Sequence, residues 1–181
     1  MRPLLLVLLL PLLCRAETPA AIRPGEFFQY RVNWGVLLGV GEIKISAPEA
    51  EASSPVQRVT IDTASHGLAR MLYPYVNHAE VSLDRTSGTL RSIQESGTGF
   101  CKSDSSTDFD YTKNLATHVD RADPRESRSL ALPSDHPVDL ISALLATRHW
   151  RAQPGDQCTA LAVFDGQLYP VTLYAIRVET I

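Results

Sequence analysis

The sequence predicts a mainly β protein: an antiparallel meander that forms a barrel or a half-barrel, with one packed helix at about 138–150. Two observations carry this prediction. Most of the chain alternates apolar and polar residues with a period of two, and short turns rich in Gly, Pro and Asp separate these runs. Only one segment has a helical period. A sandwich of two sheets is the competing architecture.

The first residues predict an export signal that is not part of the fold. Arg2 supplies positive charge, and a leucine-rich apolar run extends over residues 4–13. This run is too short to cross a bilayer as a helix. Small residues at Cys14 and Ala16 suit cleavage after Ala16, so we expect a signal peptide at 1–16. Lipidation of Cys14 is the less favoured alternative.

Cleavage leaves residues 17–181, enough for a single β-rich domain in the periplasm or outside the cell. The cleaved chain loses Arg2 and Arg15 and no acid, so its net charge moves from −3 to −5. A mildly acidic chain without a basic cluster argues against a nucleic-acid partner. No later apolar run is long enough for a transmembrane helix, so we expect no transmembrane segment in the mature chain.

The alternation predicts nine or ten strands. In order they cover residues 26–34, 39–46, 58–63, 73–83, 89–95, 109–111, 115–119, 158–163 and 168–178. Gly39 and Gly41 suggest a bulge or a close approach of the backbone. Residues 65–72 fit either a short helical turn or an irregular crossing. We expect residues 97–106 to form a loop.

The helix expected at Val138 to Trp150 lies between Pro137 and the turn at Pro154 and Gly155. Its predicted packing stripe consists of residues spaced i, i+3, i+4 and i+7: Leu140, Ala143, Leu144 and Thr147. Asp139 is suited to cap the N-terminus, and Arg148 lies where positive charge is favoured. The helix therefore has a structural explanation, and we expect any functional surface on the sheet face that it leaves uncovered.

No cluster of residues predicts a reaction. The five histidines show no metal-ligand spacing, and no H-E-x-x-H, C-x-x-C or G-x-S-x-G motif occurs. His78 and Glu80 share a strand face, but the alternation assigns them to its solvated side. The glycines at 95–99 lack the phosphate-binding spacing. We therefore expect no enzyme activity, no catalytic or metal-binding residues and no cofactor.

Aromatic residues offer two interpretations. Phe28, Tyr30 and Trp34 share one strand face, and four more tyrosines are spread over other elements: Tyr73, Tyr75, Tyr169 and Tyr174. They could line a barrel that holds an apolar ligand. A plain hydrophobic core is the favoured interpretation, because a domain of this size needs that burial.

Two cysteines remain after cleavage, Cys101 and Cys158. In an oxidising compartment such a pair could form a disulfide. Two separate thiols are the alternative, because the sequence does not give their separation.

Several short patterns follow one another along the chain. They are G-E-x-x-x-Y-x-V-x-W-G at 25–35, S-H-G-L at 65–68 with L-Y at 72–73, E-V-S-L-D-R-T-S-G at 80–88, D-L-I-S-A-L at 139–144 with Arg148, and G-D at 155–156 ahead of V-F-D-G at 163–166 and Y-P-V at 169–171. In this order they resemble a bacterial exported family catalogued as domain of unknown function 3108 (DUF3108).

The resemblance implies a periplasmic or secreted β-rich protein of Gram-negative bacteria, without assigned catalytic residues. Family members continue with further strands, including a segment rich in Asp and Arg that this sequence lacks. Two interpretations follow: the chain is truncated after Ile181, or its sheet closes differently.

Export, apolar strand faces and the lack of a catalytic motif together predict a non-enzymatic binding module of the cell envelope. Its expected ligand is an apolar or lipid-like molecule, and the sequence does not identify the ligand-binding residues. A structural or interaction protein that holds an envelope protein is the alternative. A hydrolase is a third and weaker hypothesis, since it would need a polar cluster at a barrel mouth.

Overall fold

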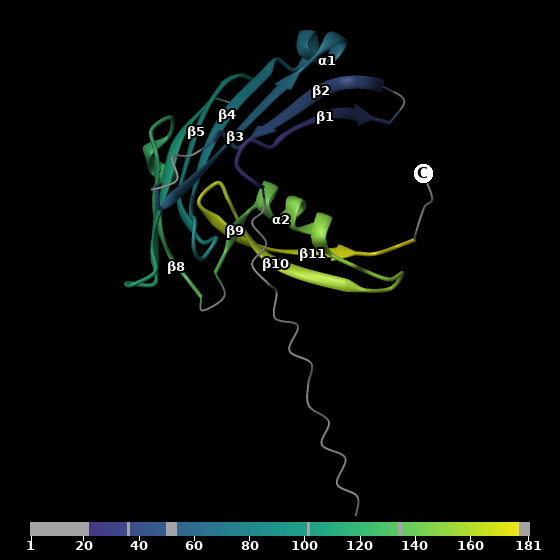
Figure 1. Ribbon diagram of the computed structural model, residues 1–181. Coiled ribbons are helices and arrows are strands. Elements are labelled where there is room, and N and C mark those ends of the chain that lie inside the picture. Colours follow the sequence, from purple (N-terminus) through teal and green to yellow (C-terminus); the bar gives the residue numbers. More distant parts are fainter. Residues whose placement is uncertain (1–21, 36, 50–53, 101, 134–135, 178–181) are drawn as a thin grey trace, which may run out of the picture.

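The computed structural model describes residues 22–35, 37–49, 54–100, 102–133 and 136–177, and the predicted signal peptide at 1–16 lies outside these ranges. The larger of two sheets has eight strands in chain order, each antiparallel to its neighbours (Figure 1). Their bounds are β1 Phe27–Trp34, β2 Leu37–Ser46, β3 Val56–Ser65, β4 Tyr75–Asp84, β5 Leu90–Gly99, β6 Ser103–Asp110, β7 Leu115–Asp120 and β8 Arg128–Ala131.

The predicted alternation is confirmed in the central strands. In β4, Ala79, Val81 and Leu83 are buried, and the residues between them are more exposed. Val81 lies opposite Val59 of β3 and opposite Ile93 of β5, so one face of the sheet is continuously apolar there. This cross-strand packing holds the meander together.

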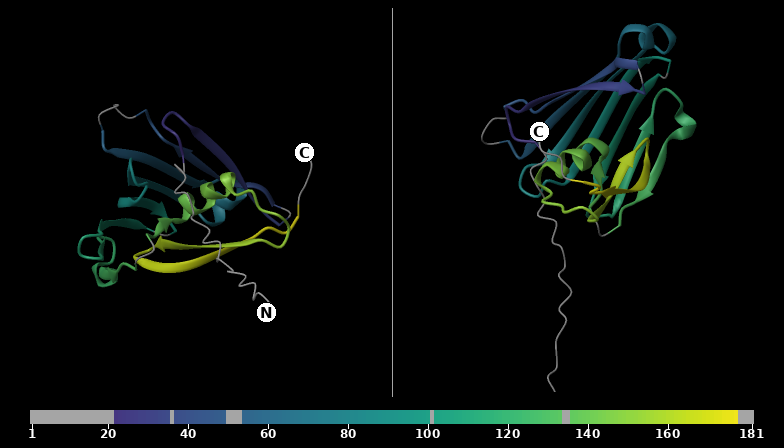
Figure 2. Two further views of the ribbon diagram at one scale, coloured as in Figure 1. Left: turned by 60° about the horizontal axis from the view of Figure 1, so that its bottom comes forward. Right: turned by 90° about the vertical axis from the view of Figure 1, so that its right-hand side faces the viewer.

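The eight-stranded sheet curves into a half-barrel and does not close, because its two edge strands, β1 and β8, do not pair with each other (Figure 2). Register shifts occur between Val32 and Trp34 of β1 and between Ser82 and Leu83 of β4. Such bulges increase local bend and twist. Gly39, opposite the first shift, has φ of +64°, as expected for a bulge glycine. The predicted half-barrel is confirmed.

A second sheet of three strands and a helix cover part of the concave face of the half-barrel (Figures 1 and 2). These elements are β9 Val138–Asp139, α2 Leu140–Ala146, the 3₁₀ turn η2 Thr147–His149, β10 Gln157–Phe164 and β11 Gln167–Tyr174. β10 and β11 form an antiparallel hairpin, and β9 pairs in parallel with β10. The predicted helix at 138–150 is therefore too long, since its first two residues pair as a strand and its last turn is 3₁₀.

The face of α2 that packs matches the predicted stripe only in part, since Ala143 is buried as predicted. Leu145 is 1% exposed and Ile141 packs against the core, whereas Leu140 and Leu144 are 46% and 47% exposed. The helix begins directly after β9, whose pairing with β10 sets the rotation at which it starts. Ile141 and Leu145 are four residues apart and thus form their own stripe on one face.

The core lies between the concave face of the half-barrel and α2 with β10. Its buried members come from both layers: Ile22, Ile45, Ala47, Val59, Ile61, Ala79, Val81, Leu83, Leu90, Ile93, Leu145 and Val163. Phe28, Ile43, Phe109, Ile141 and Leu168 pack against this cluster. Side chains therefore fill the space between these elements, and the two sheets share one core.

Several smaller elements were left open by the sequence or differ from the prediction. Residues 65–72, left open by the sequence, contain a helix, α1 Gly67–Leu72, and a 3₁₀ turn η1 covers Pro124–Glu126. β5 and β6 extend into the segment 97–106, which was predicted to be a loop. β11 ends at Tyr174, before the predicted end at Val178, which lies outside the described residues. Within the described ranges, no helix has the length and apolar character to span a membrane.

Candidate functional site

Among the described residues, two regions are candidates for a functional site. One is an apolar rim at the end of the half-barrel where α1 lies, defined by five residues: Leu38, Leu68, Met71, Leu72 and Phe100. The other is a polar cluster, His118, Asp120 and Asp165, where the β10–β11 turn meets β7.

The apolar rim forms because β3 is followed by a short helix, α1, none of whose residues is buried. The His66 amide donates to Val40 O at 2.8 Å, and Gly67 has φ of +54°, which turns the chain into α1. Pro74 follows and prevents the helix from continuing. Because α1 has no buried residue, its apolar side chains point to solvent.

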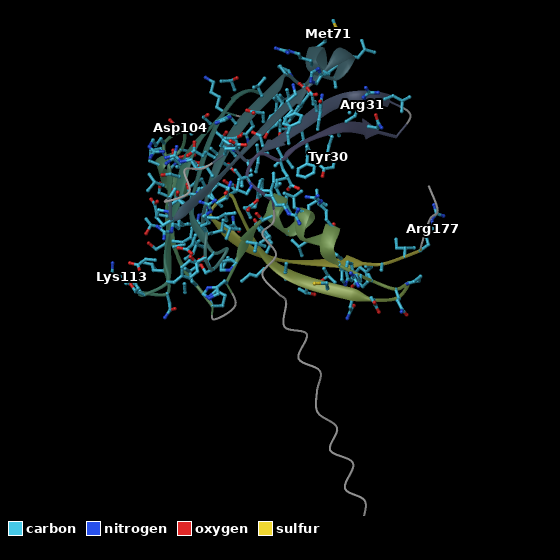
Figure 3. The ribbon with its side chains drawn as sticks, in the orientation of Figure 1. Tyr30, Arg31, Met71, Asp104, Lys113 and Arg177 are labelled. Carbon is cyan, nitrogen blue, oxygen red and sulfur yellow. The ribbon has the colours of Figure 1, made fainter. Side chains whose placement is uncertain are left out.

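Exposure at the rim is high for such large apolar groups. Leu68, Met71 and Leu72 are 70%, 81% and 84% exposed, and Met71 stands at the outer tip of the molecule (Figure 3). Leu38 of β2 and Phe100 after β5 are exposed as well. The ring centroid of Phe100 lies 4.3 Å from that of Tyr73, with the two rings tilted by 31°, so the residue after β5 contacts the end of α1.

Exposed cations lie beside the apolar rim. Arg70 is in the last turn of α1, and Lys102 lies two residues after Phe100. Arg31 of β1 approaches Gly39, the neighbour of Leu38, with its Cδ 3.9 Å from the position that a Cβ would occupy. The rim thus combines apolar groups with positive charge.

The concave face next to the rim is amphiphilic. Tyr30 and Val32 of β1 are 38% and 36% exposed. On the same face, Asn77 donates from Nδ2 to the Tyr75 hydroxyl at 3.1 Å, while its Oδ1 is buried without a hydrogen-bond partner. Gly97 lies opposite Asn77, where a Cβ would come within 2.4 Å of the Ser103 hydroxyl.

The concave face becomes polar toward β7. One row across the sheet begins with Ile61 and Ala79 and continues through Glu95 to Ser105 and Asp120. Burial raises the pKa of the Glu95 carboxyl, and the negative charges of Asp165 and Asp139 raise it further. Acidic groups thus gather at this corner of the half-barrel.

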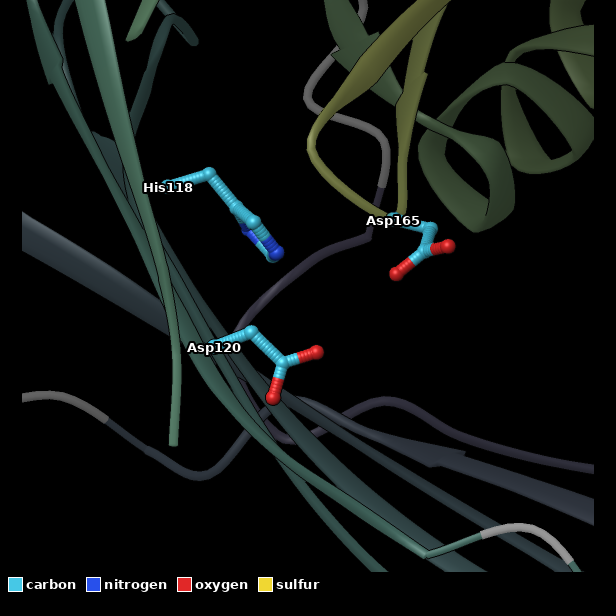
Figure 4. A group of neighbouring side chains, drawn as sticks. All are labelled: His118, Asp120 and Asp165. Atoms are coloured by element: carbon cyan, nitrogen blue, oxygen red, sulfur yellow. The ribbon is translucent and has the colours of Figure 1, made fainter. Parts of the chain in front are cut away.

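His118 is the buried member of the polar cluster, at 2% exposure. Its Nδ1 lies 2.9 Å from the Thr107 hydroxyl, and its Nε2 is buried without a hydrogen-bond partner. Asp120 follows two positions later and points to the same side of β7, and Asp165 reaches over from the β10–β11 turn (Figure 4). The nearest ligand atoms of the three residues all lie within 4.8 Å of one another.

A sequence search for short ligand spacings does not detect this cluster. His118 and Asp120 form an H-x-D pattern on one strand, and Asp165 belongs to an Asp-Gly turn far along the chain. Only the packing of the second sheet brings Asp165 close to His118 and Asp120. The H-x-D pattern was the available signal, and it is weak alone.

The polar residues named from the sequence have other partners. His78 pairs with Asp62 at 2.7 Å, and Glu80 pairs with Arg58 at 3.5 Å, both on the solvent face, as predicted. Arg148 lies 3.5 Å from Glu26. These pairs have the exposure and geometry of ordinary surface interactions.

The aromatic residues named from the sequence do not line a common cavity in the described part of the structure. Phe28 packs against the core beneath the Arg148 guanidinium, 4.4 Å from its ring centroid. Tyr169 and Tyr174 are exposed on β11. The side chain of Trp34 is not among those that the structure describes.

The predicted disulfide is not tested. Cys158 is exposed on β10, and Cys101 lies outside the described residues. The pairing therefore stays a prediction.

No family model, no curated protein and no solved structure matches this chain. The resemblance to the DUF3108 family therefore also stays a prediction, and the function must be argued from the two regions described above.

Proposed function

We propose that this chain is an exported, non-enzymatic binding module of the cell envelope that holds lipid-like molecules on its apolar rim. The expected ligand has apolar chains and an anionic head group, which match the apolar side chains and the cations of the rim. Export rests on the signal peptide predicted at 1–16, and the absence of enzyme activity rests on the lack of a catalytic motif in the sequence.

The observation that carries this proposal is the exposure of the apolar rim. Contiguous exposed apolar groups mark sites of interaction with a partner, a ligand or a membrane. Fully burying a side chain such as Leu72 or Met71 contributes about 1.5–3 kcal/mol relative to leaving it in water. A lipid surface offers that burial without requiring a preformed cavity.

Because the space beneath α2 is packed, we place the ligand site on the outside of the half-barrel. A barrel that carries a ligand needs an open lumen, whereas the core fills the space beneath α2 in this chain. Arg31, Arg70 and Lys102 add attraction to anionic head groups, and each cation near such a surface contributes about 1 kcal/mol. The rim is thus suited to an amphiphile rather than to a purely apolar molecule.

Binding to lipid vesicles tests this function. Purified protein is mixed with vesicles of phosphatidylethanolamine and phosphatidylglycerol, and the bound fraction is measured by flotation. The double variant Met71→Ser/Leu72→Ser should bind at least tenfold more weakly, since tenfold corresponds to about 1.4 kcal/mol. Phosphatidylcholine vesicles, which lack the net negative charge, should bind less protein.

The control removes equally exposed apolar groups elsewhere. Tyr174 and Ile176 are 66% and 83% exposed at the end of β11 and beyond it, so Tyr174→Ser/Ile176→Ser should leave vesicle binding unchanged. Absence of vesicle binding, or an equal loss in both double variants, would contradict the proposal. Cross-linking in cells at Met71 addresses the alternative, because a stoichiometric protein partner there would favour an interaction protein.

A further inference from the structure

We propose that His118, Asp120 and Asp165 form a binding site for a divalent first-row transition-metal cation such as Zn²⁺. The ligands would be His118 Nε2 and one oxygen of each carboxylate. This site is separate from the apolar rim and does not depend on the function proposed for the rim.

The first argument is the state of His118. A buried ring nitrogen without a partner costs about 1–3 kcal/mol, so native proteins rarely leave one unsatisfied. The Thr107 hydroxyl at 2.9 Å from Nδ1 can accept the Nδ1 proton, which leaves the Nε2 lone pair directed at the two carboxylates. A second hydrogen bond that orients the imidazole in this way is typical of metal-binding histidines.

The second argument is uncompensated negative charge. Within the described ranges, neither Asp120 nor Asp165 has a cationic side chain within 4.0 Å, although most surface acids nearby are paired, as Asp104 is with Arg121. Asp120 uses Oδ1 to accept from the amides of Ala122 and Asp123, both at 2.8 Å. Its position is therefore held by the backbone while Oδ2 remains available.

The third argument is how Asp165 is positioned. Asp165 and Gly166 form the β10–β11 turn with φ of +49° and +61°, as an Asp-Gly hairpin turn requires. A Cβ on Gly166 would lie 2.5 Å from Cγ and Cδ2 of His118, so the turn rests directly on the imidazole ring. The same contact that buries His118 therefore brings the Asp165 carboxylate to the site.

The ligand set indicates the class of cation. Imidazole nitrogen favours zinc and other first-row transition metals, and carboxylate oxygens are accepted by the same ions. Three protein ligands would leave a position for water. Bonds of about 2.0–2.2 Å require the ligand atoms to draw closer than their present separation, and the exposed Asp165 side chain can rotate to do so.

A comparison within the molecule shows why this cluster differs from a surface pair. His78 and Asp62 also place an imidazole beside a carboxylate, but the two are bonded to each other at 2.7 Å and both are exposed. Their hydrogen-bonding capacity is met by one another and by solvent. Asp62 therefore serves as a matched control.

Calorimetric titration of Zn²⁺ into tag-free protein tests the site. All proteins carry Cys101→Ser and Cys158→Ser, which remove the two thiols of the cleaved chain that could bind zinc. We expect one Zn²⁺ per chain, an increase in Kd of at least tenfold for Asp165→Asn and for Asp120→Asn, and no change beyond twofold for Asp62→Asn. Asn keeps the turn at 165, because it tolerates a left-handed backbone, and keeps the Oδ1 acceptor at 120.

Thermal unfolding with and without Zn²⁺ gives an independent readout. Zn²⁺ should raise the Tm of the parent protein and of Asp62→Asn, and it should leave the Tm of a folded Asp165→Asn protein unchanged. Co²⁺ should give a visible absorption band without a thiolate charge-transfer band. Lack of a stoichiometric site, or zinc affinity and a Tm rise that persist in both cluster variants, would overturn the proposal.

Discussion

At the scale of the residue, Gly166 is constrained by both its backbone conformation and its surroundings. It needs glycine twice, once for its left-handed φ of +61° and once for the His118 ring that leaves no room for a side chain. The sequence identifies the first requirement through the Asp-Gly pair. The second requirement depends on His118 of β7, which precedes Gly166 by almost fifty residues.

Replacing Gly166 should measure this contact. We expect Gly166→Ala to lower the free energy of unfolding by about 2–4 kcal/mol, because about 1 kcal/mol of backbone strain adds to about 1–3 kcal/mol of overpacking. Urea denaturation provides the measurement. Gly67→Ala is the control, since Gly67 has φ of +54° and no atom within 4 Å of the added Cβ, so only strain remains. Equal losses in both variants would show that the His118 contact is absent.

At the scale of the element, α2 is organised by Asp139. Its Oδ1 accepts from the amides of Ile141 at 3.0 Å and Ser142 at 2.9 Å, and the Ser142 hydroxyl donates to Oδ2. The predicted N-cap is therefore confirmed. Its burial between the two sheets was not evident from the sequence, and burial raises the pKa of this carboxyl despite the hydrogen bonds that lower it.

The raised pKa makes α2 a source of pH dependence. The folded state holds the Asp139 proton more tightly than the unfolded state, so this contribution to stability is present below the ordinary carboxyl pKa and is lost as pH rises through the raised value. Asp139→Asn keeps the cap without the charge. We therefore expect its stability relative to the parent protein to increase from pH 4 to pH 7 in urea denaturation.

Asp139→Ala separates the cap from the charge. It leaves the amides of Ile141 and Ser142 without their acceptor and should cost about 1–2 kcal/mol at neutral pH. A stability difference between Asp139→Asn and the parent protein that does not change with pH would contradict the raised pKa.

At the scale of the whole molecule, two sheets share one core. Leu145 of α2 and Val163 of β10 are buried in the same cluster as Ile45 and Val81 of the half-barrel. The half-barrel alone would expose this apolar face to water. We therefore expect both layers to unfold in one transition.

Substitutions on opposite sides of α2 should test this shared core. Leu145→Ala should lower the free energy of unfolding by about 2–5 kcal/mol, the usual cost of a cavity at a fully buried leucine. Leu144→Ala, on the same helix and 47% exposed, should cost less than about 1 kcal/mol. Circular dichroism and tryptophan fluorescence should follow one denaturation curve. Two separate transitions would show that the layers fold independently.

Most strands and the Asp139 cap could be predicted from the sequence, because alternation and capping are local. The face of α2 that packs against the core could not be predicted, since the rotation of this helix about its axis follows from the pairing of β9 with β10. The end of β5 and the start of β6 were also missed, because pairing with neighbouring strands extends β5 to Gly99 and begins β6 at Ser103, within the polar segment 97–106.

The sequence by itself determined a β meander with one buttressing helix, because period-two alternation can bury an apolar face only as strands. Only the tertiary structure decided that the sheet stays a half-barrel, since a second sheet packs on its concave side. The same packing decided that His118, Asp120 and Asp165 meet. Their meeting depends on where the curved sheet places β7 relative to a distant turn, and no local pattern of residues encodes that distance.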